Sequence, residues 1–494
     1  MQEIVATTQG KIRGLPVDGG MAFLGIPYAA APVGPALFAA PAPAAAWDGV
    51  RDAVRLGPTA PKPPYIPPYE TLLRDPVIAG DEFLNVNVWT PDPGGAGLPV
   101  MVWIHGGAFR NGSNAVPNYD GRTFARDGVV LVSINYRLGA PGFALLPDAP
   151  ANLGIRDQLA ALGWVQDNIA AFGGDPGNVT IFGESAGAMS VVTLVSVAAG
   201  SGLCHKVIAQ SGAGHTVVSA ADAAGVTAEL AGRLGVPASA AGFASVDVAR
   251  LIETQQSVSL DVARNPDPTR WGQSIVATGL AFVPVVDGEL VTERPIDAIS
   301  AGIGHDLPLL VGTTTEEYRF FVVPPGLADA VTPERLRGML TARGWDPAIA
   351  DTYTANRPAE SPGDVLAAVI TDSYFRMPAI RLAEARADAA QPTYCYEFAW
   401  RTPVGRLGAC HALEIGFVFD CLGGESAPLL AGDDPPQPLA DDMHARWVAF
   451  AKTGDPGWPA YHPDSRTVLT FDAHGSHEVA DPRSDERKLW DGVI

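Results

Sequence analysis

The chain of 494 residues carries 33 Lys and Arg against 54 Asp and Glu, which gives a formal net charge of −21. This acidic balance provides no basic surface for nucleic acid or anionic membranes, so we expect neither as a partner. The length suits two or three ordinary domains or one large α/β unit, and 47% hydrophobic residues are enough for a substantial core. Solubility is the simplest meaning of the negative charge, with attraction of cationic substrates as the alternative.

The N-terminus and the cysteines indicate the cellular setting. Residues 1–6 have neither the basic nor the apolar region of a signal peptide. The most apolar stretch, residues 189–199, is shorter than the roughly 20 residues that span a membrane. The nine histidines make no spaced metal-ligand set, and the four cysteines are too scattered for a disulfide scaffold: Cys204, Cys395, Cys410 and Cys421. We therefore expect a cytoplasmic protein without membrane partner, metal or cofactor.

Short apolar runs alternate with helical patterns along the chain, which favours an α/β fold with a mostly parallel sheet covered by helices on both faces. Six runs are predicted as strands: residues 100–105, 129–135, 179–182, 206–210, 307–312 and 394–400. Between the second and third, apolar residues from Ile155 to Phe172 recur at the three- and four-residue spacing of a helix. Asn152 is expected to cap the start of this helix, and Gly173 with Gly174 to end it.

Two kinds of segment interrupt this alternation. Residues 57–80 hold seven prolines, too many for a strand, and are predicted as an ordered loop lying over the sheet. Ala-rich helical patterns in residues 215–305 and 320–390 are predicted as cap insertions. No repeat or linker marks a boundary, so we expect a single domain over residues 1–494.

The sequence Phe-Gly-Glu-Ser-Ala-Gly at residues 182–187 places Ser185 between two glycines, after an apolar run and before a helix-compatible stretch. A serine at a sharp strand-to-helix turn is the nucleophile elbow of α/β-hydrolases. The glycines are needed because so tight a turn leaves no room for neighbouring side chains. The flanking strand and helix therefore predict Ser185 as a nucleophile.

A serine hydroxyl needs a base, an acid that orients the base, and hydrogen-bond donors for the oxyanion. Residues 105–109, His-Gly-Gly-Ala-Phe, end an apolar strand and match the His-Gly-Gly type of oxyanion loop. We predict an oxyanion hole formed by the backbone N–H groups of Gly107, Ala108 and Ala186, with Gly106 supporting it from the same loop.

Five motifs carry a family resemblance. They begin at His105 (His-Gly-Gly-Ala-Phe), Ser133 (Ser-Ile-Asn-Tyr-Arg-Leu-Gly), Asn152 (Asn-Leu-Gly-Ile-Arg-Asp-Gln), Phe172 (running through the elbow) and Trp447 (Trp-Val-Ala-Phe-Ala-Lys-Thr-Gly-Asp-Pro). Together they resemble type-B carboxylesterases, the carboxylesterase/cholinesterase family that includes bacterial p-nitrobenzyl-esterase-like enzymes. The resemblance implies an α/β-hydrolase fold, with helical cap insertions over an active-site gorge.

The resemblance also implies the acid. From the residues alone, either Glu316 or Glu317 would serve. The family's acid lies in a Gly-Thr-Thr-x-Asp-Glu segment, which matches residues 312–317 and assigns the role to Glu317, with Glu316 in the usual Asp place. The family follows its acid with glycine, whereas this chain has Tyr318, a departure that would alter the local turn.

The base follows from a second match. The family's Gly-x-x-His-x-x-Glu segment corresponds to residues 408–414 and implies His411 as the base. The resulting chain order of Ser185, Glu317 and His411 is the order expected of an α/β-hydrolase. Cys410, beside the base, is a candidate nucleophile, but a buried, inert thiol is the preferred interpretation.

Other polar residues near these motifs have supporting interpretations. Glu184 and Ser211 match family positions around the active site and are expected to orient the elbow rather than react. Arg156 and Asp157, adjacent in the chain, are predicted to form a structural ion pair.

One departure from the family concerns the Pro-rich loop. Secreted members close this loop with a disulfide, and the matching positions here are Ala60 and Phe83. The joint absence of both cysteines agrees with a reducing compartment and leaves the loop held by packing alone. Because residues 57–85 also lack the tryptophan that binds choline in cholinesterases, choline-ester specificity is not expected.

The sequence thus predicts a monomeric serine esterase that cleaves small-molecule carboxylic esters through an acyl-enzyme. Ser185 attacks the carbonyl carbon, His411 transfers the proton and Glu317 holds the imidazole. A carbamate or amide hydrolase with the same triad stays open, because leaving-group preference depends on the shape of the pocket. A non-catalytic adhesion or binding protein is the remote alternative, since such family members typically lose the nucleophile.

Aromatic residues are the candidates for the lining of the gorge, although aromatic residues more often belong to a core, and we expect about half of these to line it. The candidates are Tyr65, Tyr69, Trp271, Tyr318, Phe320, Phe375 and Phe417.

Overall fold

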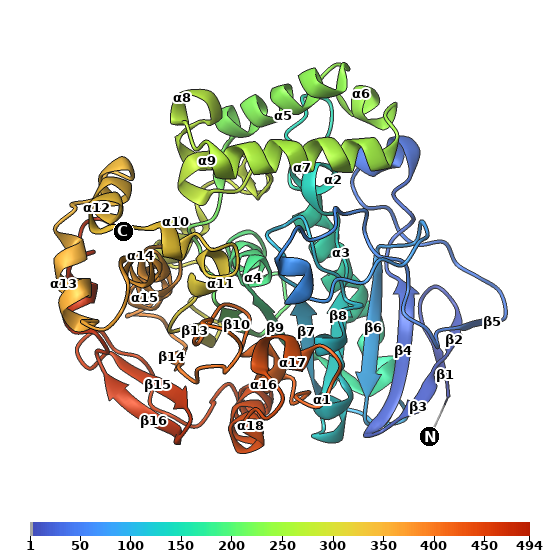
Figure 1. The fold of residues 1–494 in the computed structure, drawn as a ribbon. Helices are drawn as coiled ribbons and strands as arrows, with labels where there is room; N and C mark the ends of the chain where they lie inside the picture. The colour runs from blue at the N-terminus through green and yellow to red at the C-terminus, as the bar shows by residue number, and fades with distance from the viewer. Residues whose placement is uncertain (1–2) are drawn as a thin grey trace. The chain divides into compact units, whose positions relative to one another are not determined.

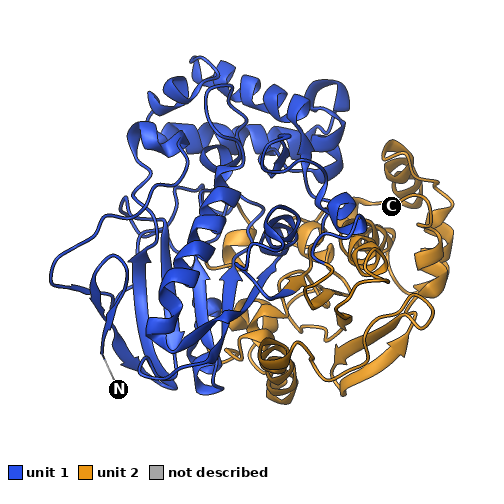
Figure 2. Ribbon diagram, turned by 180° about the vertical axis from the view of Figure 1, so that it is seen from behind, with its two compact units in different colours: residues 1–65, 75–207, 214–304 blue, residues 66–74, 208–213, 305–494 orange. Residues whose placement is uncertain are grey.

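The computed structural model describes residues 3–494 (Figure 1); Met1 and Gln2, the first residues of the segment tested for a signal peptide, lie outside the described residues. The chain forms two compact units (Figure 2). Unit 1 comprises the residues up to 65 together with 75–207 and 214–304, and unit 2 comprises residues 66–74, 208–213 and 305–494. The expectation of a single domain stays a prediction.

The main sheet of unit 1 is mixed. Its strand β7 (Leu98–Ile104) has two parallel neighbours, β8 (Val130–Ile134) and β9 (Gly174–Glu184). Beyond β8 the order continues, antiparallel at each step, through β6 (Asn85–Thr90), β4 (Gly20–Pro27) and β3 (Leu15–Val17). The strands predicted at residues 100–105, 129–135 and 179–182 are confirmed. The strands β3 and β4 are antiparallel because they follow one another through a tight turn, which leaves no length for a crossover.

The shorter strands of unit 1 form two small sheets. One contains β1 (Ile4–Ala6), β2 (Lys11–Arg13) and β5 (Val50–Asp52), and the other contains β11 (Val218–Ser219) and β12 (Val285–Val286). The strand predicted at residues 206–210 is β10 (Lys206–Gln210), which contains the boundary between the units.

The predicted helix between β8 and β9 is α3 (Leu153–Asn168), continued by a 3₁₀ turn to Phe172 and ended by Gly173 at φ 84°. Asn152 does not cap it with its side chain, which is a correction to the expectation. Asn152 adopts a left-handed conformation at φ 58°, and its amide donates hydrogen bonds to the carbonyl of Val285 (2.9 Å) and to Asp287 (2.9 Å). The side chain therefore joins α3 to the distant strand β12.

The insertion at residues 215–305 is helical, as predicted. It contains α5 (Ala220–Leu234), α6 (Ala240–Ala244), α7 (Val248–Arg264), α8 (Pro268–Trp271), α9 (Gln273–Thr278) and α10 (Pro295–Ser300). Figure 1 shows α5 and α7 side by side in a layer separate from the sheet of unit 1. The other helices of this unit are α1 (Arg122–Arg126), α2 (Gly139–Phe143) and α4 (Ala186–Ala198).

Unit 2 has its own run of strands, in the order β16-β15-β14-β13. Strands β13 (Leu309–Thr314), β14 (Thr393–Phe398) and β15 (Thr467–Asp472) are parallel, and β16 (Gly475–Ala480) is antiparallel at the edge. The strands predicted at residues 307–312 and 394–400 correspond to β13 and β14. Both are buried along their whole length, which explains why they are continuous apolar runs in the sequence.

The helices of unit 2 include the second predicted insertion, residues 320–390. This insertion contains α11 (Arg319–Val322), α12 (Pro333–Ala342), α13 (Ile349–Asn356), α14 (Pro362–Thr371) and α15 (Met377–Glu384), with a π-helical turn at Asp372–Arg376. After β14 come α16 (Ile415–Val418), α17 (Ala427–Ala431), α18 (Gln437–Thr453) and α19 (Ser484–Lys488). The C-terminal Trp490 is fully buried in a core cluster formed by α12, α13 and α14.

The Pro-rich loop is not held by packing alone, which corrects that expectation. Ala60 and Phe83 are indeed both buried apolar residues. However, the side chains of Lys62 and Asp75 form an ion pair inside the protein. Thr59 also forms a hydrogen bond through its N–H to the carbonyl of Ile78 (3.0 Å). The two arms of the loop are thus joined by polar contacts.

The ion pair predicted between Arg156 and Asp157 is wrong, because neighbours on one helix point to different faces. Asp157 is fully buried and accepts hydrogen bonds from Nε (2.8 Å) and Nη2 (2.6 Å) of Arg137, which follows β8. Arg137 also donates to the carbonyls of Leu37 (3.0 Å) and Ala39 (2.6 Å). Arg156 instead pairs with the exposed Glu289 at 2.9 Å. Arg137 therefore ties α3 to the N-terminal part of unit 1.

Replacing Asp157 by Asn is expected to lower the free energy of unfolding by about 3–5 kcal/mol, because the buried guanidinium of Arg137 would lose its counter-charge. Urea unfolding followed by circular dichroism measures the change. Arg156→Met is the control and should cost no more than about 1 kcal/mol, since its partner is exposed to solvent. Equal stability of the two variants would contradict the structural role of Asp157.

Candidate active site

Ser185 lies in the turn between β9 and α4, both in unit 1. Its backbone adopts φ 57° and ψ −122°, a strained conformation for a residue with a side chain. The flanking glycines are required by the end of β7: a Cβ at Gly187 would lie 2.0 Å from the carbonyl oxygen of Ile104, and one at Gly183 would lie 2.6 Å from the same atom. The turn leaves Ser185 partly exposed while the residues on either side are buried. This is the geometry of a nucleophile elbow.

The predicted oxyanion loop follows β7 in the same unit. Gly107, Ala108 and Phe109 all have positive φ (113°, 54° and 57°), so the chain reverses sharply. A Cβ at Gly106 would lie 2.7 Å from the carbonyl oxygen of Glu184, immediately before the nucleophile. The loop therefore approaches the elbow as closely as backbones allow. Ala186 is the first residue of α4, so its N–H has no acceptor within the helix and is available to an oxyanion.

The side chain of His105 forms a hydrogen bond with the backbone of this loop. Its Nδ1 lies 2.8 Å from the carbonyl oxygen of Gly106, and because a carbonyl only accepts, Nδ1 carries the proton. The ring stacks on Tyr136 at 4.6 Å, and the hydroxyl of Tyr136 donates to the His105 carbonyl at 2.8 Å. Burial lowers the pKa of His105 to about 3. The imidazole is therefore neutral at physiological pH and acts as a fixed hydrogen-bond donor to the loop.

The predicted base and acid contact each other in unit 2. Nδ1 of His411 lies 2.6 Å from Oε2 of Glu317, and the side chains are 7% and 0% exposed. The other carboxylate oxygen of Glu317 accepts the N–H of Thr314 at 2.8 Å, at the end of β13. A carboxylate fixed in this way holds the imidazole with its proton on Nδ1, so that Nε2 carries the lone pair that a base requires.

Glu316, the alternative acid, has a different environment. Its carboxylate pairs with Arg319 (2.7 Å) and Arg401 (2.9 Å) and accepts the N–H of Ala409 (2.8 Å). The chain at Gly408 is left-handed at φ 65°, and a Cβ there would collide with the Glu316 carboxylate. Glu316 thus anchors the segment that leads to His411, whereas Glu317 contacts the imidazole itself.

Ser211 and Cys410 are buried residues of unit 2. Ser211 has a left-handed backbone at φ 52°, and its N–H donates to the carbonyl of Gly312 at 2.8 Å. Burial, together with the nearby carboxylates of Glu317 and Glu414, raises the pKa of Cys410 well above its usual range. The thiol is therefore protonated, in agreement with the interpretation of an inert thiol.

Aromatic rings surround His411 within unit 2. The ring centroids of Phe375, Phe321 and Phe320 lie 5.0, 5.2 and 6.3 Å from that of the imidazole. Tyr69, from the Pro-rich loop, packs on Phe320 at 5.4 Å and donates its hydroxyl proton to the carbonyl of Phe321 at 3.0 Å. Phe321 was missed, although its position next to Phe320 and just after the acid is a signal that the sequence offered.

Tyr318 belongs to the outer part of the same group, with its ring 5.2 Å from Phe321.

The surroundings of the other three candidates for the gorge lining, Phe417, Tyr65 and Trp271, are different. Phe417 is fully buried between Phe398 (5.0 Å) and Trp400 (5.2 Å), which is the packing of a core side chain.

Tyr65 and Trp271 belong to unit 1 rather than to the unit that contains His411. The indole N–H of Trp271 donates to the carbonyl of Asn265 at 3.0 Å, and Arg270 lies 4.2 Å above its ring. These two contacts tie Trp271 to α8 and to the residues just before it.

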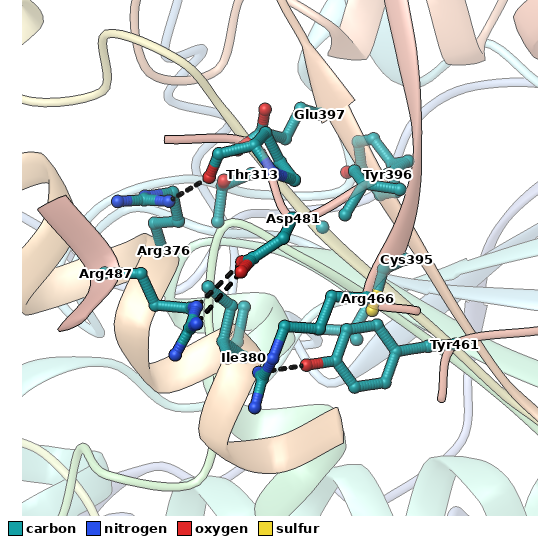
Figure 3. Close-up of a pocket in the computed structure, with 15 residues that line it drawn as sticks. Thr313, Arg376, Ile380, Cys395, Tyr396, Glu397, Tyr461, Arg466, Asp481 and Arg487 are labelled. Carbon is teal, nitrogen blue, oxygen red and sulfur yellow. Dashed lines mark hydrogen bonds and ion pairs between the residues drawn. The ribbon is translucent and has the colours of Figure 1, made fainter. Parts of the chain in front are cut away.

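Unit 2 also contains a small cavity lined by both apolar and charged side chains (Figure 3). Its volume of about 30 Å³ is enough for water but not for an organic substrate. Asp481 accepts from Nε of Arg487 (2.7 Å), and Arg466 donates to the hydroxyl of Tyr461 (2.8 Å). Neither His411 nor Glu317 lines it, so it is a structural cluster that anchors the C-terminal segment.

Within residues 3–494, no helix combines the length and the apolar character that crossing a membrane requires. No group of three or more His, Cys, Asp or Glu side chains in the described chain is arranged to hold a metal ion.

Glu317→Gln is expected to lower kcat by about 1,000- to 10,000-fold, because an amide would present the wrong partner to Nδ1 of His411 and destabilise the imidazolium. Glu316→Gln is the matched control on the adjacent residue and is expected to lower kcat by no more than about 10-fold, since it removes a loop anchor and not the acid. Steady-state kinetics on an ester substrate measures both. A larger loss for Glu316→Gln would reverse the assignment.

Comparison with known proteins agrees with this geometry. The sequence profile of the Carboxylesterase family matches residues 1–490. The chain is 37% identical to para-nitrobenzyl esterase of Bacillus subtilis (strain 168), over 98% of each chain, and 35% identical to phenmedipham hydrolase of Pseudarthrobacter oxydans, over 97% of each. The solved structure of carboxylesterase EST55 from Geobacillus stearothermophilus is similar with a TM-score of 0.85 at 35% identity, covering 99% of this chain and 100% of that one. The chain therefore belongs to the carboxylesterase family and is a carboxylic-ester hydrolase of the α/β-hydrolase fold.

Proposed function

We propose that Ser185, His411 and Glu317 form the catalytic triad of this esterase. The observation that carries the proposal is the buried contact of 2.6 Å between His411 and Glu317. It is supported by the strained backbone of the elbow at Ser185 and by the chain order of the three residues. The non-catalytic alternative is disfavoured because all three positions hold reactive side chains.

Each step of the mechanism assigns a proton to a named atom. Nε2 of His411 takes the proton of the Ser185 hydroxyl as Oγ attacks the ester carbonyl carbon. The oxyanion is bound by the N–H groups of Gly107, Ala108 and Ala186. The imidazolium, stabilised by Glu317, returns its proton to the leaving alcohol and the acyl-enzyme forms. Water then attacks the acyl carbon by the same steps and regenerates Ser185.

The aromatic group around His411 indicates the kind of alcohol released. Because His411 delivers a proton to the leaving oxygen, we infer that the rings that contact the imidazole line the space of the leaving group. Phe320, Phe321 and Phe375 are apolar, and Tyr69 directs its hydroxyl to a backbone carbonyl. We infer a preference for apolar or aromatic leaving groups.

A carbamate hydrolase is the second candidate function. The same triad would attack a carbamoyl carbon, and the chain matches a phenmedipham hydrolase over 97% of its length. We also propose that the enzyme works as a monomer in the cytoplasm, a reducing compartment in which the thiols of Cys395 and Cys410 would persist; cell fractionation tests the location.

Ser185→Ala is expected to abolish turnover of esters, with kcat reduced by about a million-fold, because the nucleophile of the triad is lost. A fluorophosphonate probe should label Ser185 alone in the unmodified enzyme, as identified by mass spectrometry. Ser211→Ala, at a serine to which no reactive role is assigned, is the control for labelling. Labelling of another residue, or activity retained by Ser185→Ala, would refute the proposed triad.

Phe321→Ala and Phe375→Ala are each expected to lower kcat/KM for a benzyl ester by about 10-fold more than for the ethyl ester of the same acid. The reason is that each ring removes apolar surface of the leaving group from water. Matched benzyl, ethyl and carbamate substrates are compared on the same preparations, so that loss of folded protein cancels. An equal loss on all substrates would show that the rings support His411 and do not select the alcohol.

A further inference from the structure

The two arms of the Pro-rich loop meet at a buried ion pair. The chain leaves unit 1 after Tyr65 and returns to it at Asp75. Nζ of Lys62 pairs with Oδ1 of Asp75, and the two side chains are only 1% and 7% exposed. A lysine and an aspartate are rarely buried, so this pair requires a physical reason.

Both charged groups also contact the residues that follow the oxyanion loop. Nζ of Lys62 donates to the carbonyl of Gly112 at 3.0 Å. Oδ2 of Asp75 accepts the N–H of the same glycine at 3.3 Å and the amide of Asn111 at 3.4 Å. The amide of Asn111 donates in addition to the carbonyl of Pro63 at 2.7 Å. The pair therefore holds Asn111 and Gly112 from both arms of the Pro-rich loop.

Gly112 cannot move without moving the oxyanion loop. Its backbone is left-handed at φ 90°, and a Cβ there would lie 2.4 Å from the carbonyl oxygen of Gly106 and 2.6 Å from Nδ1 of His105. The N–H of Asn111 donates to the carbonyl of Gly107 at 2.9 Å. Residues 105–112 thus form one tightly packed turn, with the predicted oxyanion donors at its start and the ion pair at its end.

Stability alone does not account for this arrangement. Burial lowers the pKa of Lys62, which Asp75 opposes, so the ammonium group is retained against a desolvation cost. Replacing a buried ion pair by apolar residues of similar volume is often neutral or stabilising. What an apolar pair could not supply is a set of directed hydrogen bonds to the backbone of Gly112.

We propose that Lys62 and Asp75 are positioning residues that hold the oxyanion loop in its catalytic geometry through Asn111 and Gly112. The proposal rests on the proposed function, in which Gly107 and Ala108 bind the oxyanion. A shift of this loop by about 1 Å would be felt mainly in the transition state, since misplacement of this size can cost about 100-fold in rate.

The test uses double variants, because removing one partner would leave a buried charge unpaired and could unfold the protein. Lys62→Met with Asp75→Leu is expected to keep the melting temperature within a few degrees and to lower kcat by about 10- to 100-fold, with a much smaller effect on KM. The affinity for a trifluoromethyl ketone, which forms an oxyanion on binding, should fall by the same factor as kcat/KM. Lys62→Met with Asp75→Asn, which keeps an acceptor for the Gly112 N–H, should recover part of the loss.

The control is Arg51→Met with Glu82→Gln. This ion pair lies next to the same loop but is largely exposed (33% and 49%), and it should leave both kcat and inhibitor affinity unchanged. Unchanged kcat and ketone affinity in the Lys62/Asp75 variants would overturn the positioning role, as would a loss explained fully by unfolding. Failure of the triad itself would appear separately, as activity retained by Ser185→Ala.

Discussion

The geometry around Ser185 depends on one close approach of two backbone segments, the end of β7 and the turn between β9 and α4. The carbonyl oxygen of Ile104 occupies the space that a Cβ at Gly187 would need. Because β7 and β9 are neighbouring parallel strands, this contact fixes where the chain can turn after Glu184. The turn forces Ser185 into a strained conformation and starts α4 directly behind it. The oxyanion loop follows from the same constraint, since it begins at the end of the strand that contains Ile104.

In unit 2, the main constraint is the fixed orientation of the His411 imidazole. Glu317 imposes it from the end of β13, with one oxygen on a backbone N–H and the other on His411. The adjacent Glu316 anchors the chain at Ala409. Glu316 therefore fixes the backbone at Ala409 while Glu317 contacts His411, because successive side chains beyond the end of a strand point in different directions. The aromatic rings around His411 keep water away from the pair and, in the proposed mechanism, receive the leaving alcohol.

Buried charges hold the irregular segments of unit 1. Arg137 joins α3 to the N-terminal region through Asp157 and two carbonyls, and Lys62 with Asp75 joins the Pro-rich loop to Gly112. In each case a charged side chain satisfies backbone groups that no helix or strand pairs. Loops with many prolines and glycines lack such regular pairing, so side chains must provide it. In both cases the ion pair joins a segment without regular secondary structure to the rest of unit 1.

The elements that the sequence predicted well are those governed by local chemistry. The tight turn at Ser185, the glycine turn at residues 105–109 and the six predicted strands were all recognisable, because a glycine requirement or a continuous apolar run acts over a few residues. Glu317 and His411 required the family resemblance, since Glu316 is chemically identical to its neighbour. The partners of charged and aromatic side chains were not predictable: Asp157 binds Arg137 and not Arg156, and Phe321 contacts His411 together with Phe375.

By itself, then, the sequence determined the fold class and the chemistry of an ester hydrolase, and it indicated Ser185 as the nucleophile. Only the tertiary structure decided which contacts form around these residues. They are the contact of Glu317 with His411, the antiparallel pairing of the outer strands, and the Lys62–Asp75 ion pair that contacts Gly112. The physical reason is distance along the chain. Strand register and side-chain packing bring together residues as far apart in the chain as Glu317 and His411 or Tyr69 and Phe321, and no local pattern encodes such a pairing.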